Sequence, residues 1–218
     1  MKKTALIFLS VLMIVCLVGC GSNSDKSNDG NNSGANINIT PAEIEQKIAD
    51  AIGKDNYLCD TEIDKEWLQN SFGFDLSKIE SYAAKQNSVS SVNPDTVIVL
   101  KVKDGYAEEA VKLLNTNYSQ MVDYIRQYPF STAKVLNARI YQSGNYVMYI
   151  LAGASYDGED SEAENKLAVS EYAKIDEAIK SIFGSLPNNS AVVSEDDGSA
   201  GGLTSSDDND DMPLLGGN

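Results

Sequence analysis

Residues 96–102 read Thr-Val-Ile-Val-Leu-Lys-Val, a run of β-branched and aliphatic side chains that predicts a buried β-strand. Turn-forming residues bound this run, with Asn93-Pro94-Asp95 before it and Asp104-Gly105 after it. A long helix is expected from Tyr106 to about Tyr128, where Pro129 ends it. We therefore expect this strand to lie in the middle of a sheet.

The apolar residues of the long helix recur at alternating intervals of four and three. They are Ala107, Val111, Leu114, Tyr118, Met121, Ile125 and Tyr128. This spacing is that of a heptad repeat, so pairing with a helix of a partner is one interpretation. Two of the seven positions are tyrosines and branched aliphatic residues do not dominate, which favours packing on the protein's own sheet.

Further elements are expected on both sides of this strand and helix. Thr40-Pro41-Ala42-Glu43 forms a capping box for a helix that ends at Gly53. A shorter helix is expected at 64–71 and an irregular edge strand at 81–92. Residues 138–142 and 146–151 flank Ser143-Gly144-Asn145 as a β-hairpin, and a last helix covers 162–183.

The order of these elements predicts one folded domain at residues 40–184 of α+β class. We expect a single, mostly antiparallel sheet of about four strands, covered by helices on one face. Gly184 is expected to end the last helix.

Composition limits the chemistry of the chain. Its 218 residues carry 17 basic and 32 acidic side chains, a formal charge of −15, and no histidine. Such a charge disfavours nucleic-acid binding. The missing histidine removes Ser-His-Asp and Cys-His catalysis and His-ligated zinc, and three cysteines are too few for a four-thiolate metal site. We predict no catalytic residue, no cofactor and no metal site, and hence a protein that is not an enzyme.

The amino terminus resembles a targeting signal. Residues 1–19 resemble a signal peptide, with Lys2 and Lys3 before an apolar run at 5–18. About 14 residues of helix would extend roughly 21 Å, short of the roughly 30 Å hydrocarbon core of a bilayer. The run ends in Leu17-Val18-Gly19-Cys20, which resembles the lipobox of bacterial lipoproteins. This resemblance implies a diacylglyceryl group on Cys20 and a location on the extracytoplasmic face of the cell membrane.

Polar segments flank the predicted domain. Residues 20–39 are an Asn/Ser/Gly-rich linker that cannot bury enough apolar surface to order itself. Residues 185–218 contain seven acidic side chains and no Lys or Arg, which predicts a disordered tail. Attraction of calcium or of a cationic polymer is the functional alternative for this tail, and a solvated, self-repelling segment is the favoured one.

Three further features have a functional and a structural interpretation. Cys59 is either a reactive thiol or a small buried residue, and the lack of histidine favours the second. The acidic loop at 157–164 offers oxygen ligands for calcium, but its spacing is not that of a calcium-binding hand, and Ser161 is expected to cap the last helix with Glu164. Tyrosines of the hairpin either line a groove for sugars or peptides or stabilise the sheet, and the second is favoured; they are Tyr141, Tyr146 and Tyr149.

Residues 57–184 resemble a family of uncharacterised lipoproteins of Gram-positive bacteria, known as a domain of unknown function. The resemblance rests on five short motifs. They are Trp67-Leu68, Phe72-Gly73-Phe74-Asp75, Tyr82-Ala83-Ala84-Lys85, the strand at 97–102 with Lys103-Asp104-Gly105, and Gly144-Asn145-Tyr146-Val147. It implies the architecture and a place in the cell envelope, and it supplies no catalytic residue.

Together these observations favour a lipid-anchored, non-catalytic interaction module that binds an envelope protein or a cell-wall component. A small solute-binding lipoprotein is the alternative, although 145 residues allow only a pocket within one domain. A carboxylate- or Cys-dependent envelope enzyme is the second alternative.

Overall fold

The computed structural model describes residues 38–90 and 93–193. The predicted signal peptide, Cys20, most of the linker and the acidic end of the tail lie outside the described residues.

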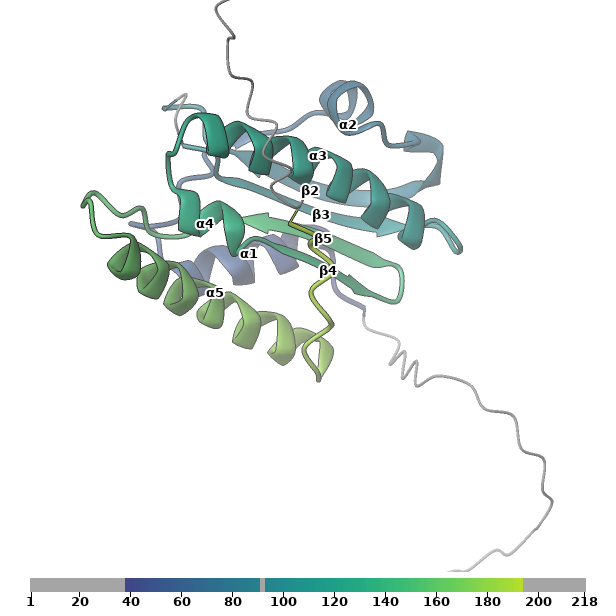
Figure 1. Cartoon of the computed structure of the whole chain (residues 1–218). Coiled ribbons are helices and arrows are strands. Elements are labelled where there is room, and N and C mark those ends of the chain that lie inside the picture. Colours follow the sequence, from purple (N-terminus) through teal and green to yellow (C-terminus); the bar gives the residue numbers. More distant parts are fainter. Residues whose placement is uncertain (1–37, 91–92, 194–218) are drawn as a thin grey trace, which may run out of the picture. The chain divides into compact units, whose positions relative to one another are not determined.

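Within the described residues, five antiparallel strands form one sheet in the order β1-β2-β3-β5-β4. The strands are β1 (Thr61–Glu62), β2 (Ile79–Gln86), β3 (Thr96–Val102), β4 (Arg139–Ser143) and β5 (Tyr146–Leu151). Strand β3 is central and has the bounds that its sequence predicts (Figure 1). The α+β class and the antiparallel sheet are confirmed.

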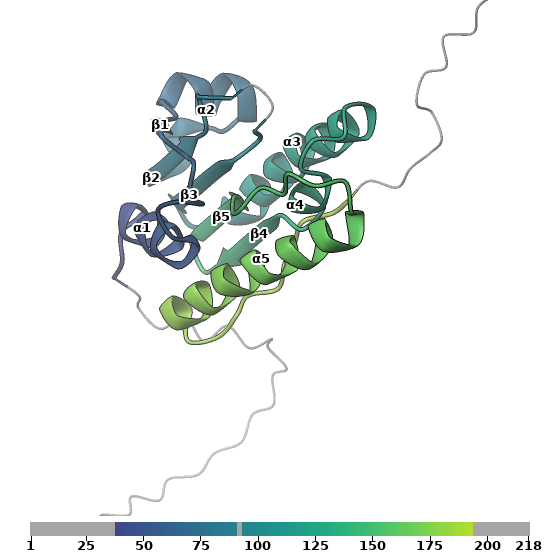
Figure 2. The same ribbon diagram turned by 90° about the vertical axis from the view of Figure 1, so that its left-hand side faces the viewer.

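Helices cover both faces of this sheet (Figures 1 and 2). The helices are α1 (Pro41–Ile52), α2 (Lys65–Phe72), α3 (Ala107–Gln127), α4 (Thr132–Leu136) and α5 (Ser161–Phe183), with a short 3-10 turn, η1, at Leu76–Lys78. The prediction of helices on one face only is wrong. The physical reason is the continuous apolar run of β3, which presents aliphatic side chains to both sides and leaves neither face suited to water.

Alternate residues of β3 contribute to two separate cores. Ile98 and Leu100 pack in the core under α3, whereas Val97 and Val99 pack in the core under α1 and α5. The apolar stripe of α3 packs in the first of these cores, as favoured above, except at Tyr128, which is exposed. The buried residues of α3 are Ala107, Ala110, Leu114, Tyr118, Val122 and Ile125.

Helix ends follow the sequence closely, with one correction. The capping box of α1 is present, because the Glu43 amide donates to Thr40 Oγ1 at 3.2 Å and Thr40 N donates to Glu43 Oε2 at 2.8 Å. Helix α5 is capped by Asp160 rather than Ser161, since the Asp160 carboxylate accepts the backbone amides of residues 162 and 163. Glu164 instead accepts the backbone amide of Ala133 at 3.0 Å and so ties α5 to α4.

Two strand predictions also change. The hairpin is confirmed, with a two-residue turn in which Gly144 has the positive φ of 55° that this position requires. The expected strand at 81–92 begins earlier and ends at Gln86, and it lies between β1 and β3 rather than at the edge of the sheet. Helix α4 was not predicted, because five residues are too few to show a helical period.

The chain continues beyond Gly184 along the outer side of β4. Asn189 donates to Ala138 O at 3.1 Å and accepts the Ile140 amide at 2.9 Å, and Ser190 N donates to Ile140 O at 2.8 Å. Asn115 of α3 holds the same segment, because its amide group donates to Ser190 O and accepts Val192 N. Residues 185–193, assigned above to the tail, thus form a strap over β4; the acidic side chains of the tail all follow them.

We predict that Asn189→Ala lowers the free energy of unfolding by about 1 kcal/mol, because the Ala138 carbonyl and the Ile140 amide lose their side-chain partner. Urea unfolding followed by circular dichroism measures the change. Asn188→Ala is the matched control, since Asn188 is exposed in the same segment. Equal stability of the two variants would contradict the role of the strap.

Candidate functional site

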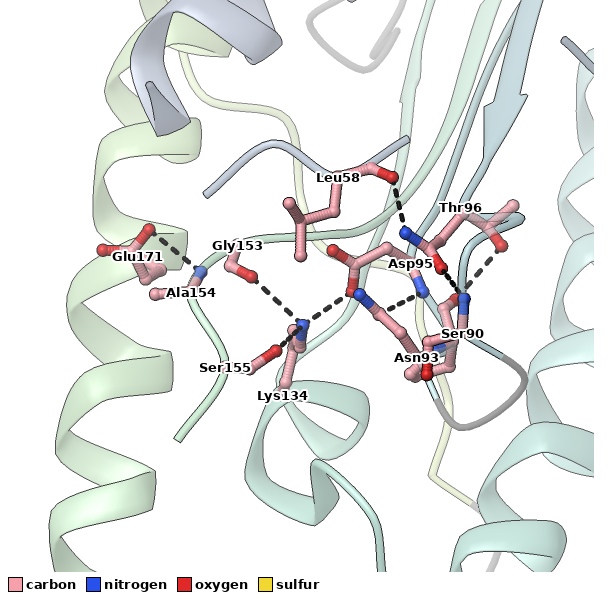
Figure 3. A network of polar contacts seen from close by, with 12 residues as sticks. Leu58, Ser90, Asn93, Asp95, Thr96, Lys134, Gly153, Ala154, Ser155 and Glu171 are labelled. Atoms are coloured by element: carbon pink, nitrogen blue, oxygen red, sulfur yellow. Dashed lines mark hydrogen bonds and ion pairs between the residues drawn. The ribbon is translucent and has the colours of Figure 1, made fainter. Parts of the chain in front are cut away.

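The chain entering β3 carries a buried ion pair. Asp95 Oδ1 lies 2.6 Å from Lys134 Nζ of α4, and the two side chains are 0% and 4% exposed. Lys134 Nζ also donates to Gly153 O and to Ser155 Oγ, both at 3.1 Å (Figure 3). We call Asp95, Lys134, Gly153 and Ser155 the Asp95–Lys134 network. It joins the start of β3, helix α4 and the loop after β5.

Local turn chemistry places Asp95 in this network. Asn93 Oδ1 accepts the Asp95 amide at 3.0 Å, which is the local contact that favours Asn in turns. The Asn87 amide donates to Asp95 O at 2.9 Å, and Asn87 Nδ2 donates to Leu58 O at 2.8 Å. The predicted turn Asn93-Pro94-Asp95 therefore holds the carboxylate in place as well as ending the loop.

Burial dominates the electrostatics of Asp95. Desolvation raises the pKa of its carboxyl group, against the lowering effect of Lys134. Asp95 Oδ2 is buried and has no hydrogen-bond partner within the described residues. Lys134 is thus the main group that compensates the carboxylate, with smaller lowering effects from Asn93 and Gly153.

The network is unsuited to Ser–Lys catalysis. The three N–H groups of the Lys134 ammonium donate to Asp95, Gly153 and Ser155, so no lone pair faces the Ser155 hydroxyl. A general base must accept the hydroxyl proton. The geometry instead makes this network an anchor between three segments of the fold.

Cys59 is a buried residue, as the sequence favoured. It is 5% exposed, and burial together with the charge of Asp95 raises the pKa of its thiol to about 12. Close by, Glu45 accepts hydrogen bonds from Tyr57 and from Lys85 Nζ, and burial together with the Glu45 contact raises the pKa of Tyr57. The Cys59 thiol and the Tyr57 hydroxyl therefore hold their protons at neutral pH, and neither has the low pKa of an activated nucleophile.

The other sequence candidates lie apart from one another. Asp157, Gly158 and Glu159 are exposed, and the described residues contain no group of three or more His, Cys, Asp or Glu placed to hold a metal ion. The hairpin tyrosines are all buried. Tyr141 donates to Asp176 at 2.6 Å, Tyr146 donates to Ile39 O at 2.5 Å, and the Tyr149 ring packs against Tyr118. They are packed inside the fold, as the structural interpretation of the sequence favoured.

A pocket of about 200 Å³ lies on the α3 side of the sheet, beside the start of β3. Residues 87 and 93–95 form part of its wall. The remainder is Gln86 and Thr96 from the sheet, Met121, Tyr124 and Ile125 from α3, and Phe130 from the loop after it. We call this the α3 pocket.

Exposed aromatic side chains lie at the α3 pocket: Tyr124 and Phe130 are part of its lining, and Tyr128 packs against Tyr124. Tyr124, Tyr128 and Phe130 are 47%, 52% and 44% exposed, and the rings of Tyr124 and Tyr128 lie 5.1 Å apart. We call these three residues the aromatic patch. The sequence analysis missed it, although Tyr124 lies outside the apolar stripe of α3, which is a signal that this ring faces solvent.

Comparison with known sequences identifies the region that contains both features. Residues 54–152 match a family described as a domain of unknown function, DUF4358. The matched region is 99 of the 218 residues long. It contains the whole sheet with α2, α3 and α4, and therefore Asp95, Lys134 and the α3 pocket, whereas α1 and α5 lie outside the match.

The expected relationship to a domain of unknown function is confirmed by this match. No curated protein and no solved structure matches the chain. Among the described helices, none is both long and apolar enough to cross a bilayer.

We predict that Lys134→Met lowers the free energy of unfolding by about 3–5 kcal/mol at neutral pH, because it leaves the buried Asp95 charge without a partner. Urea unfolding measures the loss. Lys166→Met is the control, since the exposed Lys166–Glu162 pair at 2.8 Å is expected to contribute less than about 1 kcal/mol.

The loss should depend on pH in a defined direction. A folded pKa above the unfolded value gives Asp95 a stabilising contribution at low pH that disappears as pH rises through the folded pKa. Removing Lys134 removes a lowering effect, so the folded pKa rises further. The deficit of the variant is therefore smallest near pH 4 and grows towards neutrality, and a pH-independent deficit would contradict a charged Asp95.

We also predict that iodoacetamide modifies Cys59 in denaturant but not in the native protein at neutral pH, because the folded thiol is buried and protonated. Mass spectrometry of the peptide that contains Cys59 measures the modified fraction. Rapid native labelling would show that this thiol is accessible and ionised.

Proposed function

We propose that this chain is a lipoprotein of the Gram-positive type, anchored to the outer face of the cytoplasmic membrane through Cys20. The observation that carries the proposal is the sequence Leu17-Val18-Gly19-Cys20, placed directly after an apolar run and before an Asn/Ser/Gly-rich linker. Two acyl chains are what stable anchoring requires, and a diacylglyceryl group supplies them.

The folded domain acts as a non-catalytic interaction module for an envelope protein or a cell-wall component. The states of its candidate reactive groups support this role: Lys134 is a fully engaged donor, and the pKa of Cys59 lies far above neutrality. A carboxylate- or Cys-dependent enzyme would need one of these groups, or another of its kind, in an activated state.

A small solute-binding lipoprotein is the second candidate, and the α3 pocket favours it. Its volume of about 200 Å³ is below the roughly 300–1,000 Å³ of sites for drug-sized ligands, so it suits a single small ring or side chain. A thermal-shift screen of small neutral solutes tests this alternative; stabilisation that disappears in Tyr124→Ala would favour it over a module for macromolecular partners.

We predict that the wild-type chain enters the detergent phase in cloud-point phase separation and incorporates a fatty-acid analogue in growing cells. Cys20→Ser should remain in the aqueous phase or keep its signal peptide, without the label. Cys59→Ser is the matched control and should behave as the wild type, because Cys59 is buried. An unlabelled, water-soluble wild-type protein would overturn the anchor.

The interaction role has its own test. Cross-linking in intact cells, followed by mass spectrometry, should recover a specific envelope component with the wild-type chain. Recovery of no specific component, with unchanged envelope properties in a deletion strain, would count against the module.

A further inference from the structure

The α3 pocket lies at the end of the domain opposite the segment that leads to the linker. Ile39 is held by Tyr146, which pairs with Lys101 near the end of β3, whereas the pocket contacts Thr96 at its beginning. Lys101 and Thr96 are five residues apart along the strand, which corresponds to about 17 Å. Under the proposed anchor, this places the pocket on the side of the domain remote from the point of attachment.

The pocket combines aromatic and uncharged polar groups. Tyr124 and Phe130 offer exposed ring faces, Met121 and Ile125 provide an apolar floor, and Gln86 supplies an amide with two donors and an acceptor. Among the described lining residues, Asp95 is the only Asp, Glu, Lys or Arg. Its carboxylate is turned towards Lys134 (Figure 3). The lining thus gives an ionic ligand no counter-charge.

We infer that the α3 pocket and the aromatic patch bind a neutral sugar ring. The apolar C–H face of such a ring packs on aromatic side chains, while its hydroxyl groups need neutral donors and acceptors at the rim. The volume of about 200 Å³ suits one ring, and the neighbouring ring of Tyr128 extends the platform for the next unit of a chain. This inference rests on the proposed function and names the cell-wall component as a neutral polysaccharide.

Asp95 and Lys134 are positioning residues for this site. The backbone of residues 93–95 lines the pocket, and the side chain of Asp95 fixes that backbone to α4 through Lys134. Helix α4 follows directly on the loop that carries Phe130. One ion pair therefore holds two walls of the pocket against each other.

The test uses the full-length chain in detergent micelles and saturation-transfer NMR. The probes are a tetramer of N-acetylglucosamine, a neutral glucan tetramer, free N-acetylglucosamine and an uncharged apolar hexapeptide. Purified peptidoglycan freed of protein and anionic polymer serves in a parallel sedimentation assay. The variants are Tyr124→Ala and Phe130→Ala. Trp67→Ala is the matched control, since Trp67 is as exposed as Tyr124, at 47%, and lies on α2.

We expect a saccharide signal from the wild type and from Trp67→Ala, and binding on the order of tenfold weaker in Tyr124→Ala and Phe130→Ala. Unfolding temperatures close to the wild type exclude misfolding, which exposed positions should permit. Binding of the tetramers and of peptidoglycan identifies a polymer as the source of the sugar, whereas equal binding of free N-acetylglucosamine identifies a free solute; both support the site.

Binding of the hexapeptide alone, dependent on Tyr124, would overturn the choice of ligand in favour of a protein partner. Absence of binding to every probe, or equal loss in Trp67→Ala, would overturn the site. These outcomes are independent of the lipid anchor, whose failure appears only in the phase separation of Cys20→Ser and wild type. If cross-linking recovers no envelope component while sugar binding is intact, the interaction role fails and the sugar site stands.

Discussion

Burial of the central strand on both faces is the constraint on which this structure depends. Strand β3 carries an apolar side chain at almost every position, and a strand of this kind is stable only when both sides are covered. Helix α3 covers one side, while α1 and α5 cover the other. The match to DUF4358 ends before α5 and begins after α1, so the second layer is supplied by segments outside it. The matched region and its flanking helices therefore share one sheet with a core on each face.

The fold was predictable from the sequence where neighbouring residues alone determine the local structure. The bounds of β3, the capping box of Thr40 and the Gly144 turn depend on neighbouring residues only, and each agrees with the structure. Helices on the second face were not predicted, because periodicity shows that a helix has an apolar side but not which side of the sheet it covers. The α5 cap shifted by one position, since Asp160 and Ser161 are both good capping residues and only packing decides between them.

The candidate site was much less predictable than the fold. Asp95 and Lys134 are 39 positions apart, and nothing near either residue indicates the other. For the hairpin tyrosines the sequence favoured a structural role over a groove, in agreement with their burial, but it passed over Tyr124 and Phe130, which are exposed. The same ring serves packing or recognition according to its tertiary surroundings, so residue type alone could not separate the two. The burial of Cys59 was inferred correctly because the chain contains no histidine to activate it.

The strap at residues 185–193 has a consequence for molecules held at high density. An outer strand of a sheet presents unpaired amide and carbonyl groups that recruit strands of neighbouring molecules. Asn189 and Ser190 form hydrogen bonds with these backbone groups at Ala138 and Ile140. These groups are therefore not free to pair with a strand of another molecule. Under the proposed lipid anchor, which would confine many copies to two dimensions, such shielding would keep adjacent copies from joining edge to edge.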